Sequence, residues 1–262
     1  MSLVLQISDT HFGTERAEVV EALARLAEEL RPQLVVLSGD ITQRARPKQF
    51  AAAAAFARRL GPAALLAIPG NHDVPLFDLF ARLLQPYARY ARAFGPELEP
   101  AFESDDFLVL GVNTTRATRH KQGEISAGQV ARVCGRLARA ASRQLRVVVT
   151  HHPLHVRHGE EHNLCRGHAD ALRAWARAGA DVVMGGHIHL PYVERVPDLP
   201  RALWAVQAGT AVSRRVRPGG GEANSVNALR YEAGEPACSV ERYDYGTGAF
   251  SARGTVRIRL DR

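Results

Sequence analysis

The sequence predicts an α/β fold, in which short buried strands alternate with helices that connect them. Two observations lead to this prediction. In the first two-thirds of the 262 residues, short apolar runs alternate with segments whose apolar positions recur every three or four residues. After Pro200 the helical period disappears, and short apolar runs are separated by turns rich in glycine, which indicates a β-rich tail.

The first expected elements are a strand at 3–7 and a helix at 19–30. The helix is expected because its apolar side chains fall on one face at three- and four-residue spacing. Pro32 ends it, since proline cannot continue a helix, and an apolar run at 34–37 provides the next strand. The same cycle then repeats with a helix at 50–60 and a strand at 64–68.

The middle of the chain continues this alternation. A helical pattern covers 76–94, and Pro86 is expected to break or kink it. Ser126 and Gln129 have the spacing of a capping box, which indicates a helix start there. The remaining elements are strands at 107–112, 145–149 and 182–184 and helices at 126–140 and 172–178.

The tail is expected to contain further strands, at 203–207, 225–231, 238–243 and 255–260. Strands this short and few bury too little apolar surface to fold alone, so we expect them to pack with the rest of the chain. We therefore predict a single domain over 1–262. Its α/β portion at 1–199 is expected to carry the functional site, and the portion at 200–262 is expected to complete the second sheet.

The charge composition narrows the classes of function. Lys and Arg outnumber Asp and Glu by 34 to 27, which gives a formal net charge of +7. This excess suits an anionic substrate, although the base composition of the source genome would explain Arg-rich usage equally well. The Arg residues are scattered rather than gathered into a stripe, which argues against a nucleic-acid partner.

Cysteine usage and hydropathy point to a reducing, aqueous compartment. Cys134, Cys165 and Cys238 are odd in number and widely spaced, so neither a disulfide framework nor a thiolate zinc site is expected. The N-terminus shows no basic and apolar leader, and no later stretch approaches the roughly 18 apolar residues of a membrane helix. We therefore predict a cytoplasmic protein with no membrane partner.

Short polar clusters follow several of the expected strands. They are Ser8-Asp9-Thr10-His11, Gly39-Asp40, Gly70-Asn71-His72-Asp73, His151-His152 and Gly186-His187-Ile188-His189. In an open α/β sheet the carboxyl ends of the strands meet at one edge, so residues distant in sequence come together in one crevice. A single Asp-x-His or Gly-Asp is common in ordinary loops, but a turn has no need for the histidine of Gly-Asn-His-Asp. The joint occurrence of these clusters favours a functional site.

The clusters contain the side chains of a metal centre. Asp9 and His11 are two residues apart, so in an extended segment they project to the same side, and His187 and His189 repeat this spacing. Together the clusters offer two aspartates, one asparagine and four histidines as candidate ligands, which is more than one tetrahedral ion needs. Mixed nitrogen and oxygen ligands without thiolate suit a pair of divalent Mn, Fe, Zn or Co ions better than Mg or Ca.

In their order along the chain, the clusters resemble the motifs D-x-H, G-D, G-N-H-D/E, H and G-H-x-H of the calcineurin-like metallophosphoesterases. The resemblance covers 3–189. It implies a four-layer αββα sandwich, in which two mixed β-sheets are flanked by helices and the metal pair lies at one edge. Within the family, His151-His152-Pro153 and the segments at 168–172 and 209–214 are similar to those of bacterial cyclic-nucleotide phosphodiesterases and glycerophosphodiesterases.

The resemblance also implies a role for each matched residue. It implies one metal at Asp9, His11 and His189, the other at Asn71, His151 and His187, and a bridge between them at Asp40. His72 is implied to face the substrate, where it donates a hydrogen bond to a phosphoryl oxygen or protonates the leaving alkoxide. Asp73 is implied to orient the imidazole of His72. For His152 and the histidines at 155–168, a role in the site and a packing or solvated role both stay open.

The leading interpretation is hydrolysis of a small-molecule phosphodiester, of the cyclic-nucleotide or glycerophosphodiester type, by water activated at the metal pair. A phosphomonoesterase, including a protein phosphatase, fits the same motifs. A nuclease is favoured by the basic charge, but the chain leaves no room for a separate DNA-binding domain. A non-catalytic scaffold would be free to lose the ligands and His72, which are all present. The sequence leaves open whether the chain forms a homo-oligomer.

Overall fold

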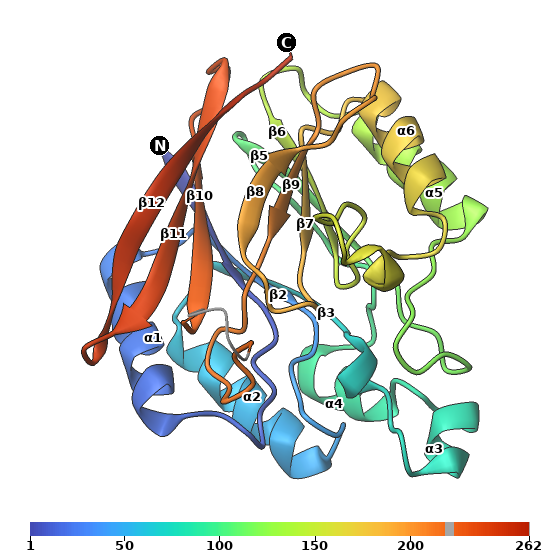
Figure 1. Ribbon diagram of the computed structural model, residues 1–262, viewed down its shortest axis with the longest axis vertical. Coiled ribbons are helices and arrows are strands. Elements are labelled where there is room, and N and C mark those ends of the chain that lie inside the picture. Colours follow the sequence, from blue (N-terminus) through green and yellow to red (C-terminus); the bar gives the residue numbers. More distant parts are fainter. Residues whose placement is uncertain (218–222, 262) are drawn as a thin grey trace.

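The computed structural model describes residues 1–217 and 223–261, which form two β-sheets packed face to face with helices on the outer sides (Figure 1). The first sheet has the order β12 (Ala249–Arg259), β11 (Ala237–Gly246), β10 (Ser225–Tyr231), β1 (Ser2–Ile7), β2 (Leu34–Ser38) and β3 (Ala64–Ile68). The second has the order β4 (Ala101–Glu103), β5 (Phe107–Val112), β6 (Leu145–Thr150), β7 (Val182–Gly185), β9 (Trp204–Gln207) and β8 (Tyr192–Arg195).

Both sheets combine parallel and antiparallel pairs. In the first sheet β1, β2 and β3 are parallel, whereas β10, β11 and β12 are antiparallel to their neighbours. In the second sheet β5, β6, β7 and β9 are parallel, and the edge strands β4 and β8 are antiparallel. The predicted α/β architecture of two mixed sheets flanked by helices is therefore confirmed.

Four helices form the two outer layers. α1 (Ala17–Leu30) and α2 (Pro47–Arg59) pack on the first sheet, and α5 (Ala127–Leu137) and α6 (His168–Ala178) pack on the second. Each buries an apolar stripe of three- and four-residue spacing, as the sequence predicts. At the start of α5 the Gln129 N–H donates to the Ser126 hydroxyl at 3.2 Å, and the Ser126 N–H donates to the Gln129 side chain at 2.9 Å, so the capping box is confirmed.

The segment expected as one helix over 76–94 forms two short helices, α3 (Leu79–Leu84) and α4 (Ala88–Phe94), with the predicted break at Pro86. α4 is anchored by Tyr90, which is buried and donates its hydroxyl proton to the Ala67 carbonyl at 2.7 Å. α3 projects from the body of the molecule, where it exposes most of its apolar side chains (Figure 1).

The prediction that residues 200–262 complete the second sheet is wrong for most of that segment. β9 joins the second sheet beside β7, whereas β10, β11 and β12 extend the first sheet from β1. The reason is that β2 occupies only one edge of β1, and the other edge pairs with β10 over the register Ser2 with Tyr231 to Gln6 with Asn227. The strands β4 and β8 were not expected, because they are three and four residues long and carry little continuous apolar sequence.

The buried side chains form three layers of core. One lies between the two sheets and receives side chains from both, including Val36, Val149, Val206 and Leu229. The others lie between each sheet and its helices. These layers fix the two sheets relative to each other, so the loops at the carboxyl ends of their parallel strands are brought to one edge. Over the described residues, no helix combines the length and the apolarity that crossing a membrane requires.

Candidate metal centre and active site

The polar clusters meet in the loops that follow β1, β2, β3, β6 and β7. Backbone contacts hold neighbouring loops together, since the Asp9 N–H donates to the Gly39 carbonyl at 3.1 Å. Where the loops after β2 and β3 cross, glycine is required, because a Cβ on Gly70 would collide with the backbone and the carboxylate of Asp40. The convergence of the clusters therefore depends on close backbone packing.

Several of the predicted ligands lie on unusual backbone. Positive φ angles occur at nine non-glycine residues of the described chain, and five of these are Asp9 (52°), His11 (43°), Asp40 (47°), His187 (74°) and His189 (54°). Asp and His tolerate this region better than most residues, but it still costs on the order of 1–2 kcal/mol each. Strain of this kind collects at functional sites, where the surrounding structure holds it in place.

The first group of predicted ligands consists of Asp9, His11 and His189, which are all buried. The His11 and His189 Nε2 atoms lie 3.1 Å apart, and His189 Nε2 lies 3.2 Å from the Asp9 carboxylate. The opposite ring nitrogen of His189, Nδ1, donates to the Arg215 carbonyl at 2.6 Å. That bond fixes the tautomer and leaves Nε2 with a lone pair directed at the group, as a metal ligand requires.

The second group contains Asn71, His151 and His187. Buried atoms of all three, Asn71 Oδ1, His151 Nε2 and His187 Nδ1, have no hydrogen-bond partner among the described residues. Burying such a polar atom without a partner costs about 1–3 kcal/mol. His151 Nδ1 donates to the Ser38 carbonyl at 2.9 Å, so Nε2 is again the free nitrogen. Unpartnered oxygen and imidazole nitrogen atoms are a donor set that fits a divalent transition metal.

Asp40 lies between the two groups. One of its carboxylate oxygens is 3.7 Å from His11 Nε2, and the other is 3.3 Å from His151 Nε2. The second oxygen also accepts the His72 N–H at 2.8 Å, which fixes the orientation of the carboxylate. A carboxylate that reaches both groups in this way has the geometry needed to bridge two cations.

The electrostatics of the site keep the ligand carboxylates ionised and divide the histidines into two kinds. Burial alone would lower the pKa of His151 and of His189, but Asp40 outweighs it and raises the pKa of His151 to about 9, and Asp9 raises the pKa of His189. Burial lowers the pKa of His11 to about 3, and burial together with the neighbouring His151 lowers the pKa of His187 to about 4, so both imidazoles are neutral at pH 7. Burial alone would raise the pKa of Asp40, but His151 and His72 outweigh it and hold that pKa well below its usual range. Neutral imidazoles and ionised carboxylates are the forms that bind cations.

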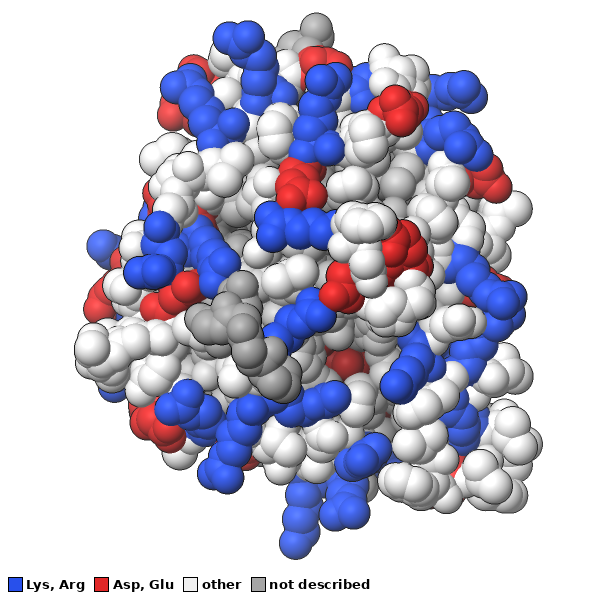
Figure 2. Space-filling view, viewed as in Figure 1, with Lys and Arg blue, Asp and Glu red and all other residues white. Residues whose placement is uncertain are grey.

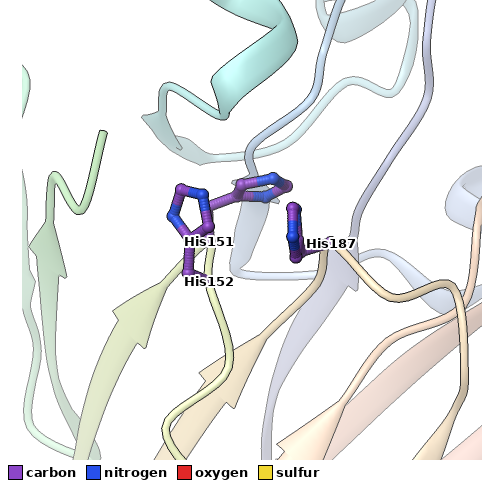
Figure 3. A group of neighbouring side chains, drawn as sticks. All are labelled: His151, His152 and His187. Atoms are coloured by element: carbon purple, nitrogen blue, oxygen red, sulfur yellow. The ribbon is translucent and has the colours of Figure 1, made fainter. Parts of the chain in front are cut away.

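His152 was left open by the sequence, and it lies in the same cluster. The imidazoles of His151, His152 and His187 gather at the ends of β6 and β7 (Figure 3), with ring centroids of His152 and His187 4.7 Å apart. His152 is buried, and its Nδ1 lies 2.7 Å from the Thr114 hydroxyl. This histidine therefore packs against both His151 and His187 of the second group.

The loop histidines differ from His152 in their contacts. His155 lies 3.6 Å from Glu194, His158 lies 3.3 Å from Glu161, and His168 Nδ1 donates to the Cys165 carbonyl at 2.9 Å. None of these partners is one of the predicted ligands.

His72 extends from the loop after β3 towards the first group. Its ring meets the ring of His11 edge to face at a centroid distance of 4.8 Å. His72 Nδ1 donates to the Gln43 carbonyl at 2.9 Å, which leaves Nε2 facing the site. Gln43 was not found by sequence reasoning, because a backbone carbonyl carries no residue-type signal.

Asp73 does not orient His72, so that part of the prediction is wrong. Its buried carboxylate accepts backbone N–H groups from Ile41, Thr42 and Gly70 at 2.8–3.0 Å and the Thr42 hydroxyl at 2.8 Å. Because these donors hold the Asp73 carboxylate, the imidazole of His72 bonds through Nδ1 to the Gln43 carbonyl instead. Burial and the nearby Asp40 raise the pKa of Asp73 to about 6, although the backbone donors oppose the shift. Asp73 thus ties the loops after β2 and β3 together.

We predict that Asp73→Ala lowers the free energy of unfolding by roughly 3 kcal/mol or more, because it leaves three buried N–H groups without an acceptor. Chemical denaturation measures this loss. Asp73→Asn keeps one carbonyl oxygen as an acceptor and should recover part of the stability. An alanine variant as stable as the wild type would show that these hydrogen bonds do not hold the loops.

The chain matches known proteins in sequence. The model of the calcineurin-like phosphoesterase family matches residues 2–191. The glycerophosphodiester phosphodiesterase GpdQ of Enterobacter lignolyticus (strain SCF1) is 30% identical over 165 residues. This match spans 58% of the chain and 57% of that relative, so it covers little more than half of either protein.

Solved structures share the fold at low sequence identity. A dimetal phosphatase from Danio rerio is similar with a TM-score of 0.68 and 13% identity, over 99% of both chains. The purple acid phosphatase PPD1 from yellow lupin (Lupinus luteus) gives a TM-score of 0.70 and 12% identity, over 99% of this chain and 54% of that one. Vps29 complexed with zinc from Entamoeba histolytica gives a TM-score of 0.51 and 15% identity, over 98% of this chain and 99% of that one. Because the family model covers most of the sequence and all of the motif clusters, the chain belongs to the calcineurin-like phosphoesterase family.

Proposed function

We propose that this protein hydrolyses small-molecule phosphodiesters with water activated at a pair of divalent metal ions. The observation that carries the proposal is the position of Asp40, whose carboxylate reaches both His11 and His151. On one side of it lie Asn71, His151 and His187, with buried polar atoms that have no hydrogen-bond partner among the described residues. On the other side lie His11 and His189, whose Nε2 atoms are 3.1 Å apart. A buried carboxylate among unpartnered donors supports a metal pair better than it supports a structural ion pair.

In this proposal Asp9, His11 and His189 hold one ion, Asn71, His151 and His187 hold the other, and Asp40 bridges them. Such ions, when bound, would neutralise charge on the phosphate and lower the pKa of a bound water. The donor set of imidazole nitrogens and carboxylate or amide oxygens supports Mn, Fe, Zn or Co. His72, held through its Nδ1 by the Gln43 carbonyl, presents Nε2 to the substrate as a hydrogen-bond or proton donor.

Support for a diester substrate comes from the relative named as a glycerophosphodiester phosphodiesterase. That name describes a protein of which only 57% is matched, so the substrate type of this chain rests on analogy. The metal pair alone would not impose a diester preference, because a monoester dianion carries more negative charge for the cations to bind. The proposed substrate is a cyclic nucleotide or a glycerophosphodiester. The cytoplasmic location and the single domain stay predictions from the sequence.

We predict a higher kcat/KM for phosphodiesters than for the matching monoesters. The comparison uses a bis-aryl phosphate with the corresponding aryl phosphate, and a cyclic nucleotide with its linear product, at fixed pH and Mn²⁺ concentration. A consistent preference for monoesters would move the protein to the phosphatase alternative. Activity confined to oligonucleotides would make it a nuclease.

The alternative functions have less support. On the face shown in Figure 2, Lys and Arg lie among Asp and Glu in the upper half and outnumber them in the lower half, but they form no single stripe of the kind that favours a nuclease. The fold is shared with Vps29, whose name states no enzyme activity, as well as with phosphatases, so the fold alone does not establish an enzyme. The unpartnered site atoms argue against a scaffold, because a protein with no use for cations gains nothing from burying them.

A homo-oligomer is supported by the apolar surface of α3. Five large side chains in α3 and just before it are 63–79% exposed: Phe77, Leu79, Phe80, Leu83 and Leu84. At about 150–250 Å² for each aromatic side chain, this amounts to roughly 500 Å² of apolar surface in one patch, at the upper end for a monomer. Two copies related by a two-fold axis would bury the same patch twice, about 1,000 Å², which meets the lower limit of a specific interface. We propose that a second copy of this chain covers this apolar patch.

We predict that the double variant Phe80→Ser, Leu84→Ser lowers the apparent mass from dimer to monomer, because both side chains lie on one face of α3. Sedimentation at micromolar concentration measures the mass. Val256→Ser on β12 removes an exposed apolar side chain elsewhere and should leave the dimer intact. A monomeric wild type would contradict the proposal.

A further inference from the structure

The segment that follows β9 supplies the backbone support of the first ligand group. The Thr210 hydroxyl donates to the Asp9 carbonyl at 2.6 Å and lies 2.9 Å from the Ser213 hydroxyl. Ser213 Oγ accepts the Arg215 N–H at 3.0 Å, and the Arg215 carbonyl accepts the proton of His189 Nδ1. The backbone of Arg215 is therefore held directly by His189 and, through Ser213 and Thr210, by Asp9.

From this fixed backbone, the side chain of Arg215 reaches over the site. Its Nη1 atom lies 3.2 Å from His72 Nε2, 3.2 Å from His11 Nδ1 and 3.3 Å from the Gln43 amide oxygen. His72 Nε2 is the nitrogen that the Gln43 carbonyl leaves free for substrate. The guanidinium and the proposed proton donor therefore occupy the same side of the centre.

The charge of Arg215 is not neutralised by the protein. No carboxylate of residues 1–217 or 223–261 forms an ion pair with it, although the nearby Arg217 pairs with Glu160 at 2.6 Å. Its contacts are two imidazoles and one amide, which are weak partners for a guanidinium. A cation held at His11 would repel this group, whereas an anion lying between the cation and the guanidinium would attract both. The space between the Arg215 guanidinium and the proposed cation at His11 therefore suits a negatively charged group.

We propose that Arg215 binds a non-bridging oxygen of the phosphoryl group, so that it acts as a specificity-determining residue that selects an anionic phosphorus centre beside His72. This inference rests on the proposed function, and it adds a protein ligand for the phosphoryl group to those that the metals provide. The planar fork of Arg matches a phosphate better than the point charge of Lys does. Losing a charge-assisted hydrogen bond of this kind weakens binding by roughly 10- to 100-fold.

The experiment compares the metal-loaded wild type with Arg215→Ala, Arg215→Lys and the control Arg214→Ala. Arg214 is the adjacent, exposed arginine, and the contact that it makes to the chain near the site is through its backbone N–H to the Thr14 carbonyl. Calorimetric titration with inorganic phosphate measures the affinity, and elemental analysis measures bound metal. KM and kcat for a bis-aryl phosphate are measured alongside.

We expect Arg215→Ala to weaken phosphate binding by roughly 10- to 100-fold and to raise KM, with the metal content of the wild type retained. Arg215→Lys should recover part of the affinity because it keeps the charge, and Arg214→Ala should bind phosphate as the wild type does. Unchanged phosphate affinity in Arg215→Ala would overturn the inference. So would a loss of metal in both Arg215 variants, since Arg215 would then be a brace for His11 and His72.

The failure of this inference and the failure of the proposed function give different results. If the wild type hydrolyses phosphodiesters while Arg215→Ala binds phosphate equally well, the inference fails and the proposed function stands. If the wild type takes up no metal and hydrolyses no phosphoester, the proposed function fails, and the absence of phosphate binding overturns the role of Arg215 as well.

Discussion

Replacing Asp40 with alanine is expected to abolish hydrolysis and to empty or greatly weaken both metal sites. Its carboxylate lies 3.7 Å from His11 Nε2 and 3.3 Å from His151 Nε2. No other carboxylate of the described residues is within 4.0 Å of both nitrogens, since Asp9 is that close only to His11. Removing it takes away the single negative charge that the two proposed ions would share. It also removes the acceptor of the His72 N–H, so the loop after β3 loses a fixed contact.

Metal analysis after extensive dialysis against metal-free buffer tests this expectation. Asp170→Ala is a suitable control, because Asp170 is an exposed carboxylate on α6 that pairs only with Arg173 in the described structure. The control should retain the metal content and the activity of the wild type. Two tightly bound ions in the Asp40 variant would rule out a bridging role.

For His72→Ala we expect a folded protein that retains its metals and has a kcat lowered by roughly 10²–10⁴, the range typical of losing a general acid or an equivalent transition-state contact. The metals should stay because His72 is not among the three proposed ligands of either ion, although its imidazole lies within 4.8 Å of ligand atoms of His11 and Asp40. The loss should be smaller for substrates with good leaving groups, such as aryl phosphates, because these need little protonation.

Steady-state kinetics with alkyl and aryl phosphodiesters, measured on His72→Ala and on the control His158→Ala, separate the two roles of the imidazole. His158 is exposed and touches Glu161 rather than the site, so its variant should behave as the wild type does. Equal losses for alkyl and aryl leaving groups would argue against proton donation and leave hydrogen bonding to the phosphoryl oxygen. A His72 variant without bound metal would place this residue among the ligands instead.

Much of the site was predictable from local sequence. The clusters at Asp9, Asp40, Asn71, His151 and His187 each follow an apolar strand, and the structure brings all of them to one edge. Strand periodicity and the direction of parallel strands are sufficient for this result, because a residue that follows a parallel strand has only one edge at which to lie.

The errors involve interactions between distant segments. The pairing of β10 with β1 depends on which edge of β1 is free, and no short pattern in the tail records that. The acceptor role of Asp73 depends on N–H groups of Ile41 and Thr42 in another loop. Arg215 reaches His72 only because the segment after β9 folds against the loop after β1. Sequence spacing could not indicate these contacts.

The most direct test of the account is a metal titration of the chelated, metal-free protein with Mn²⁺, in which bound metal and hydrolysis of a bis-aryl phosphate are measured on the same samples. The account predicts no hydrolysis without metal, and full hydrolysis when two ions are bound per chain, in agreement with the two ligand groups joined by Asp40. Hydrolysis that persists at full rate with no bound metal would contradict it. Saturation with two ions and no hydrolysis of any phosphoester would contradict it equally.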